Sequence, residues 1–451
     1  MGLVMPVGHL AQARISVIRA SRRTPSIAML WALVSSLACA TGATAQVTAP
    51  AEGSRPVRSV EMGGQIRQQY ERFANEEWGA EEPDSDGYWL QRYMWHVDAR
   101  ISRRVRLFGE VKSGIEVGRA GGPRPPDEDQ LDVHQAFVDV SFGPVTWRIG
   151  RQELAFGSQR LVSAREGPNV RQTFDAGSIV LEQGRWRLHG FGGRYVGTDE
   201  GVFDDSSGTG RALWGIYAVR WLERRSRGVD LYYLGYRREH ATFDQRQGHE
   251  LRHSWGARVW KSSGDLDYNL EAVVQVGRFA DADIRAWTIA SDTGYRIESV
   301  AGRPRLGLRA DMTSGDRDRH DDRLGTFNAL FPRGAYFGLI AAAGPANHMD
   351  LHPQVAVNLR DGLVVTTSWL FFWRRQVDDG IYGISGNLLR SGAGTHSKFV
   401  GHSPGVEAEW QVTERLSLTG NASLFTAGSF IDESGPAHTI RFVAGWATYR
   451  F

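Results

Sequence analysis

The sequence predicts an all-β fold, namely a transmembrane up-and-down antiparallel β-barrel of about 18 strands with long extracellular loops and short periplasmic turns. Three observations favour it: apolar side chains recur at every second position, long and short connections alternate, and a short arginine-rich leader precedes the first strand. The residues include 15 Trp, 13 Tyr, 20 Phe and 53 Gly, yet the mean hydropathy is −0.36. Strands with one lipid-facing side and one polar side explain this mixture.

Residues 1–45 are expected to be a cleaved signal peptide that directs the chain towards the bacterial outer membrane. This segment holds four arginines and no acidic residue, followed by an apolar run at 28–40 and a small-residue cleavage site at Ala43–Ala45. The run is short for a membrane anchor, which is the alternative interpretation. Residues 46–56 are then expected to form a short periplasmic segment, and residues 57–451 the barrel.

The composition argues against two other classes of protein. Cleavage of the leader changes the formal charge from +2 to −2, because four arginines leave with it, so a basic surface for nucleic acid is not expected. Beyond the leader, no apolar run approaches the roughly 20 residues that a membrane-spanning helix needs, which argues against an inner-membrane transporter. The only cysteine, Cys39, lies in the leader, so the mature chain is expected to form no disulfide.

The strands are predicted from a hydrophobic period of two. In residues 93–101, Tyr, Trp, Val, Ala and Ile alternate with His, Asp and Arg, and residues 105–115, 305–311 and 406–412 repeat the pattern. Each stretch is about ten residues long, which is the length that a tilted strand needs to cross the hydrocarbon layer. One set of alternate side chains is therefore expected to face lipid, and the other set the lumen.

The connections between these stretches alternate in length. The long ones are residues 74–87, 118–130, 155–175, 195–211, 239–248, 315–347, 378–397 and 428–437. The short ones are residues 102–103, 143–144, 183–184, 225–228, 262–264, 361–362 and 413–414. The alternation is weak at residues 279–283, where the predicted outer loop shrinks to a few residues. An up-and-down barrel produces this pattern and places both termini in the periplasm, whereas a soluble propeller or sandwich would not separate the two lengths.

The last strand carries a signal for membrane insertion. Val443, Gly445, Ala447, Tyr449 and Phe451 alternate up to an aromatic carboxyl-terminal residue. This resembles the terminal signature that the bacterial barrel-assembly machinery recognises, so that machinery is an expected partner, together with outer-membrane lipid and lipopolysaccharide.

The polar faces of the strands are rich in arginine. Of the 53 basic residues only Lys112, Lys261 and Lys398 are lysine. Arginine stays charged and presents a planar fork of donors that matches a carboxylate, so a ring of arginines in a lumen favours anions. Because Asp98 and Glu110 share the same faces, ion pairs that brace the wall are the alternative role for any one arginine. The strand phase places these arginines in the lumen: Arg67, Arg100, Arg106, Arg148, Arg187, Arg220, Arg252, Arg258 and Arg309.

Two blocks of the sequence resemble a known family. The first block, residues 150–175, contains GRQELAFG followed by RLV, REGPNVR and FD; the second block, residues 325–338, contains GTFNALFP followed by YFG. Both resemble the signature of the bacterial alginate export outer-membrane family, and the compatible strand pattern extends the resemblance over the mature chain. It implies a monomeric barrel, constricted by inward-folded loops and lined by arginine, through which an anionic uronic-acid polymer leaves the cell.

The resemblance also implies site residues. Arg151, Arg160, Arg165, Arg171 and Asp175 fall within the first block and are expected near the constriction. Arg165 and Arg171 would hold polymer carboxylates, and Asp175 would orient a neighbouring guanidinium. The strand phase puts Arg151 at a strand end and Arg148 on the inward side of the same strand.

The polymer, the direction of transport and any periplasmic export partner stay open at this stage. Alternatives to a polysaccharide exporter are an anion-selective uptake porin for small acidic nutrients and an outer-membrane enzyme that degrades the polymer. No catalytic motif, cofactor loop or metal site is predicted, since the acidic run at residues 316–322 lacks the pattern of a calcium loop, and His348 and His352 precede a proline at a strand start. Trp214, Phe191 and Trp260 fall on the inward phase and could stack on sugar rings or pack the interior.

Overall fold

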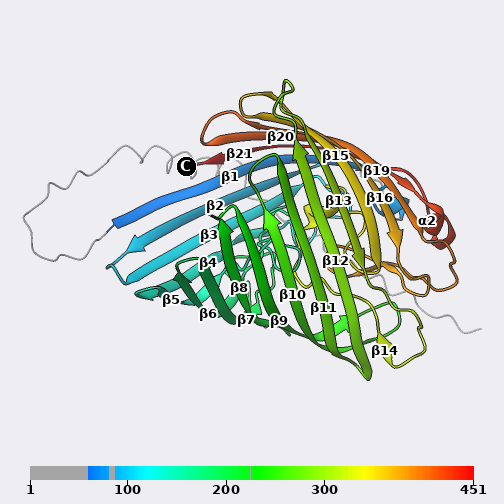
Figure 1. Ribbon diagram of the computed structural model, residues 1–451, viewed down its shortest axis with the longest axis horizontal. Coiled ribbons are helices and arrows are strands. Elements are labelled where there is room, and N and C mark those ends of the chain that lie inside the picture. Colours follow the sequence, from blue (N-terminus) through cyan, green and yellow to red (C-terminus); the bar gives the residue numbers. More distant parts are fainter. Residues whose placement is uncertain (1–58, 81–86, 209, 224) are drawn as a thin grey trace, which may run out of the picture. The chain divides into compact units, whose positions relative to one another are not determined.

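The computed structural model describes residues 59–80, 87–208, 210–223 and 225–451. Eighteen antiparallel strands close into a barrel, which confirms the predicted fold and strand number. The first strand pairs with the second on one side and with the last on the other, so the sheet has no free edge (Figure 1). The predicted signal peptide, the segment 46–56 and Cys39 lie outside the described residues.

The barrel strands follow one another around the wall. They are β1 (Ser59–Ala74), β2 (Tyr88–Arg100), β3 (Val105–Val117), β4 (Asp129–Phe142), β5 (Val145–Gln152), β6 (Phe174–Gln183), β7 (Trp186–Tyr195), β8 (Arg211–Glu223), β9 (Arg227–Thr242), β10 (Gln247–Lys261), β11 (Leu266–Phe279), β12 (Ala282–Arg296), β13 (Arg305–Thr313), β15 (His348–Arg360), β16 (Leu363–Arg374), β19 (Phe399–Gln411), β20 (Leu416–Ala427) and β21 (Ile440–Arg450).

The remaining elements lie in the connections. They are the short strands β14 (Arg323–Leu324), β17 (Ile381–Tyr382) and β18 (Leu388–Arg390), the 3₁₀ turns η1 (Glu76–Gly79) and η2 (Gly334–Phe337), and the helix α2 (Ser429–Ser434). None of the helices in the described part of the chain is long and apolar enough to cross a membrane.

The strands have the expected two-sided pattern. On β1, Val60 and Met62 are exposed on the outer face, whereas Arg67 and Gln69 on the other face are buried inside the barrel. The same alternation exposes large apolar side chains at every second position of most other strands. Hydrocarbon can therefore cover one set of side chains while the other set lines or fills the interior.

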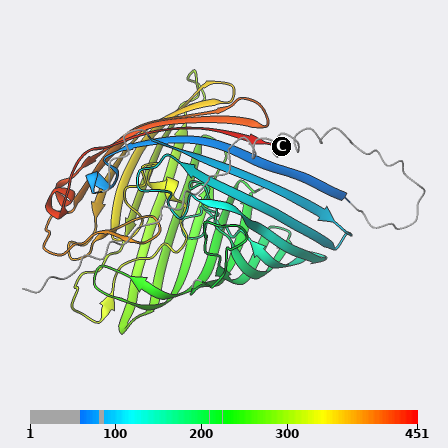
Figure 2. The same ribbon diagram turned by 180° about the vertical axis from the view of Figure 1, so that it is seen from behind.

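Long and short connections segregate to opposite ends of the barrel, as predicted. The long loops include residues 153–173 between β5 and β6 and residues 314–347 between β13 and β15. The view from behind in Figure 2 shows loop segments inside the barrel. The weak outer loop is a two-residue turn between Phe279 and Ala282. The β9–β10 loop is shorter than predicted, residues 243–246, because both strands extend further outward. Residues 297–304 form a longer periplasmic turn that the pattern did not single out.

Candidate functional site

The loop of residues 153–173 reaches across the barrel interior to strands that are not its neighbours. Arg92 on β2 donates from Nε to the carbonyl of Asn169 at 2.8 Å and from Nη2 to the carbonyl of Glu166 at 2.8 Å. Arg67 on β1 donates from Nη1 to the same Glu166 carbonyl at 3.0 Å. Because β3 and β4 separate these arginines from the loop's own strands, the loop folds into the lumen.

Arg92 is the main attachment of this loop. Its side chain is only 1% exposed, and its guanidinium also pairs with the Glu166 carboxylate, from Nη1 to Oε1 at 2.7 Å. A buried acceptor left without a donor costs about 1–3 kcal/mol, so loss of this side chain would loosen the loop from the wall.

Two carboxylates of the loop share the guanidinium of Arg171. Its Nε lies 2.9 Å from Oε1 of Glu153 and 3.2 Å from Oε2 of Glu166. Burial raises the pKa of Glu153 to about 7, against the opposing charge of Arg171. Burial also acts to raise the pKa of Glu166, but the charges of Arg92, Arg171 and Arg67 outweigh it and lower that pKa below its usual value. At neutral pH the loop thus carries one firmly charged carboxylate and one that is partly protonated.

The second block lies against the first. Phe331 forms a parallel bridge with Val162, accepting from the amide of Ser163 at 2.9 Å and donating its own amide to Leu161 at 2.8 Å. Its ring packs against Phe174, with 5.0 Å between ring centroids. Loops 153–173 and 314–347 are therefore one paired unit inside the barrel, which we call the plug.

A third loop, residues 375–398, clamps the plug. The Asp379 carboxylate is fully buried and accepts from Thr326 Oγ1 and from the Tyr382 hydroxyl, each at 2.6 Å, and from the Asp316 amide at 2.9 Å. Burial raises the pKa of Asp379, although these hydrogen bonds act in the opposite direction. Because Thr326 and Asp316 belong to the plug and Asp379 to the third loop, these hydrogen bonds hold the plug to that loop as well as to the wall.

Arg160 joins the plug to the far wall. Its guanidinium pairs with Asp311 on β13 and lies 3.9 Å from Glu271 on β11. The Tyr336 ring of the second block contacts two guanidinium groups, with centroid distances of 4.4 Å to Arg160 and 5.2 Å to Arg309. Arg160 therefore anchors the plug rather than pointing freely into the lumen.

Below the plug, the wall is braced by alternating charges. Asp98, Arg106, Asp139 and Arg148 form a continuous ladder across β2 to β5, with Nε–Oδ distances of 2.8 Å for Arg106 to Asp98 and 2.7 Å for Arg148 to Asp139. Arg106 also reaches Asp139 at 3.0 Å, and Arg148 lies 3.8 Å from the Phe137 ring centroid. Each guanidinium keeps an exposed edge, since about a quarter to a third of the two arginine side chains is open.

A second ladder crosses β11, β12 and β13. Arg305 pairs with Asp267 at 2.5 Å and lies 3.5 Å from Asp292, and Arg309 pairs with Asp292 at 2.8 Å. Arg258 similarly pairs with Asp230 at 2.7 Å. Bracing and lining are thus combined in the same arginines.

Other cations are more open to the lumen. Arg187 is 45% exposed and lies 3.4 Å from Glu182 near the periplasmic end. Arg100 on β2 and Arg333 on the plug are exposed, and neither has an ion-pair partner among the residues that the structure describes. The positive charges of Arg333 and Arg309 interact with the Glu407 carboxylate on β19. Arg165, held in a left-handed backbone conformation, donates from Nη2 to the carbonyl of Val170 at 3.4 Å.

The structure places Arg220 on the outer face, so the expectation that it lines the lumen was wrong. Ile216 on the same face of β8 is 58% exposed, and Arg220 lies 4.8 Å from the outward-facing Trp186 ring. Trp214 shares this face, whereas Leu213 and Tyr217 are buried inside. The inner face of β8 is apolar because it packs against the plug. The prediction took the polar face as the inner one and therefore exchanged the two faces of this strand.

Arg151 and Asp175 pair with each other at the outer ends of β5 and β6. Arg151 Nε lies 2.9 Å from Asp175 Oδ1, and Nη2 donates to the Asp205 carbonyl at 3.3 Å. Arg151 shares its side of β5 with the exposed Ile149. Asp175 thus orients the guanidinium of Arg151. This ion pair links the ends of two strands and takes no part in the plug contacts of Arg160 and Arg171. Phe191 and Trp260 do point inward; Trp260 donates to Asp230 at 2.8 Å.

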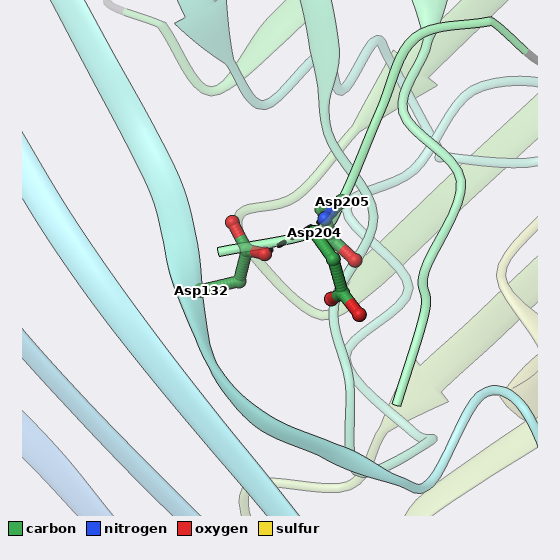
Figure 3. A group of neighbouring side chains, drawn as sticks. All are labelled: Asp132, Asp204 and Asp205. Atoms are coloured by element: carbon green, nitrogen blue, oxygen red, sulfur yellow. Dashed lines mark hydrogen bonds between the residues drawn. The ribbon is translucent and has the colours of Figure 1, made fainter. Parts of the chain in front are cut away.

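An acidic group lies where the loop of residues 196–210 meets β4. Figure 3 shows Asp132, Asp204 and Asp205 close together, with the Asp205 amide donating to Asp132 Oδ2 at 2.8 Å. Lys112 Nζ already lies 2.7 Å from Asp205 and 2.7 Å from Asp129. The group therefore has its own cation and fastens the loop to the wall.

Sequence reasoning missed Arg92, Lys112 and Arg333 as site residues. Arg92 and Lys112 lie on alternating polar faces that the pattern did identify, so the signal existed, but it could not say what each side chain touches. Arg333 lies in an irregular loop, where no periodicity reports orientation.

Both the sequence and the barrel are similar to known proteins. A family model described as "Alginate export" matches residues 58–444. Among solved structures, the barrel is similar to Pseudomonas aeruginosa OpdK with vanillate (10% identity, TM-score 0.59, 87% of this chain and 98% of that chain). It is also similar to a BenF-like porin from Pseudomonas fluorescens Pf-5 (12%, 0.59, 87% and 98%) and to Pseudomonas aeruginosa OccK2 (OpdF) in complex with glucuronate (13%, 0.56, 88% and 98%). No curated protein matches.

Proposed function

We propose that this chain, which belongs to the alginate export family, lets an anionic polysaccharide, alginate or a similar uronic-acid polymer, diffuse passively through its barrel. The family and the porin-like barrel make the protein an outer-membrane pore and a channel rather than an enzyme. The identity of the polymer is the proposed part. The chain would act as a monomer, inserted through the strand that ends at Phe451.

The observation that supports the proposal is a set of partly or fully exposed guanidinium groups on the inner wall and on the plug. Arg148, Arg187, Arg100 and Arg333 combine positive charge with exposure to the lumen. A guanidinium can bind a carboxylate with two parallel hydrogen bonds, and it is weakly hydrated, so exchange from one arginine to the next costs little desolvation. A polymer with one carboxylate per sugar presents such groups at regular intervals. Arg171 is paired with Glu153 and Glu166, so it would bind a polymer carboxylate only after releasing one of these two side chains.

Two of the similar structures support the class of solute but not its size. OccK2 is described in complex with glucuronate and OpdK with vanillate, and both ligands carry a carboxylate. Their likeness to this chain is one of fold, so an uptake pore for small acidic nutrients is the second candidate.

Planar-bilayer recording with added polymer tests the proposal. Polyuronate should block the ion current of the single barrel at concentrations where a neutral glucan of the same length does not, because only the charged chain pairs with the guanidinium groups. If monomeric glucuronate reduces the current while polyuronate has no effect, the uptake pore replaces the exporter. Equal effects of the charged and neutral polymers would contradict an electrostatic site.

A further inference from the structure

The outer face of the barrel has a hollow where a cylinder should be convex. Its volume is about 900 Å³, and it extends diagonally from β13 to β21. That volume is within the range of about 300–1,000 Å³ that ligand sites have. The hollow is lined by outward-facing apolar side chains, each at least two-fifths exposed: Leu306, Val355, Trp369, Val406, Leu424 and Val443.

Two prolines account for the hollow. Pro353 on β15 and Pro404 on β19 flank Trp369 of β16 and both line the hollow. Proline cannot donate a ladder hydrogen bond, and pairing is interrupted at Pro353 between β15 and β16 and at Pro404 between β19 and β20. The strands of this part of the wall curve along their length (Figure 1).

Two arginines lie at the outer end of the hollow. Arg441 lines it and is the cross-strand neighbour of Leu424 on β20, while Arg72 on β1 is the neighbour of Val443. Arg72 and Arg441 are therefore diagonal neighbours on the outer face, about 7–8 Å apart. Both are exposed, and neither guanidinium has an ion pair or a hydrogen bond within the part of the chain that the structure describes.

We infer that the hollow and this arginine pair bind one phosphorylated glycolipid of the outer leaflet. Arginine binds phosphate through charge-assisted, often bidentate hydrogen bonds, and β21 begins at Ile440 directly after an extracellular loop, at the level of the lipid headgroups. The apolar hollow leads from the two cations into the hydrocarbon region, so an acyl chain can lie in it while the phosphate stays at the arginines. An outer-leaflet lipid that carries several acyl chains and phosphates on a sugar core meets both conditions.

Native mass spectrometry of the detergent-purified barrel, titrated with purified lipid A or with phosphatidylglycerol, tests this site. The unmodified barrel should bind one lipid A in preference to phosphatidylglycerol. The double substitution Arg72→Ala/Arg441→Ala should weaken lipid A binding at least tenfold, whereas Arg285→Ala, an exposed outward arginine at the outer end of β12, should not.

A second pair of variants tests the hollow itself. Ala422→Trp fills it and should also weaken binding, while Ala257→Trp, an exposed outward alanine on the opposite part of the wall, should not. The barrel's resistance to detergent before heating confirms folding of each variant. Equal binding of the two lipids, no binding at all, or equal losses in the control variants would overturn the inference. Ion conduction should be unchanged in all four variants, so the outcome is independent of the proposed export function.

Discussion

Replacing residues 327–337 by a Gly-Ser segment of the same length is expected to raise the single-channel conductance several-fold. These residues contain Phe331, which pairs with the first loop through Leu161 and Ser163, and Tyr336, whose ring contacts Arg160 and Arg309. Without those contacts the second block no longer pairs with the first loop or packs against Arg309 on β13, while the Arg160–Asp311 pair still holds the first loop to that strand. The strand ladder does not depend on them, because β13 and β15 still pair with each other.

The control is a replacement of the same kind in the periplasmic turn at residues 299–303, which lies outside the plug. It should leave the conductance as it is in the unmodified barrel. If the barrel folds and the 327–337 replacement also conducts as before, these residues do not occlude the lumen and the plug has to be sought in another loop.

The double substitution Arg100→Glu/Arg333→Glu is expected to abolish anion selectivity and to shift the channel towards cations. These two arginines are exposed without a partner carboxylate among the described residues, so each reversal changes the lumenal charge by two units with no ladder to absorb it. Near Arg333, Glu407 would then add to the negative charge. The reversal potential across a KCl gradient measures the change.

Arg220→Glu is the matched control, because this arginine lies on the outer face beside Trp186. It should leave the reversal potential unchanged, and Arg100→Lys/Arg333→Lys should keep the anion selectivity. A shift as large for Arg220→Glu as for the lumenal pair would show that the assignment of faces on β8 is wrong.

The barrel was predictable because its constraint is local. Lipid on one side forces a period of two, and on β5 that period correctly separated Arg148 from the outward Trp147 and Ile149. On β8 the same rule failed. There the inner face contacts the plug and not water. Leu213 and Tyr217 on this face are therefore apolar and buried, whereas Arg220 is on the outer face. When both faces of a strand have apolar surroundings, the alternation of apolar and polar side chains no longer shows which face is inside.

The plug could be predicted only as an inward-folded loop and not as a set of contacts. Arg171 was expected to hold polymer carboxylates and Arg160 to lie near the constriction. The structure pairs Arg171 with Glu153 and Glu166, and Arg160 with Asp311 and Glu271. These partners come from sequence positions up to about 150 residues away. Such pairings depend on closure of the whole barrel, which no local pattern reports.

The sign of the reversal potential of the unmodified barrel shows whether the occluded lumen is a path for anions. In a KCl gradient across a planar bilayer we expect a low conductance carried mainly by chloride, because the guanidinium groups of Arg100 and Arg333 are exposed and have no ion-pair partner among the described residues. A reversal potential of the opposite sign, with current carried mainly by potassium, would contradict it.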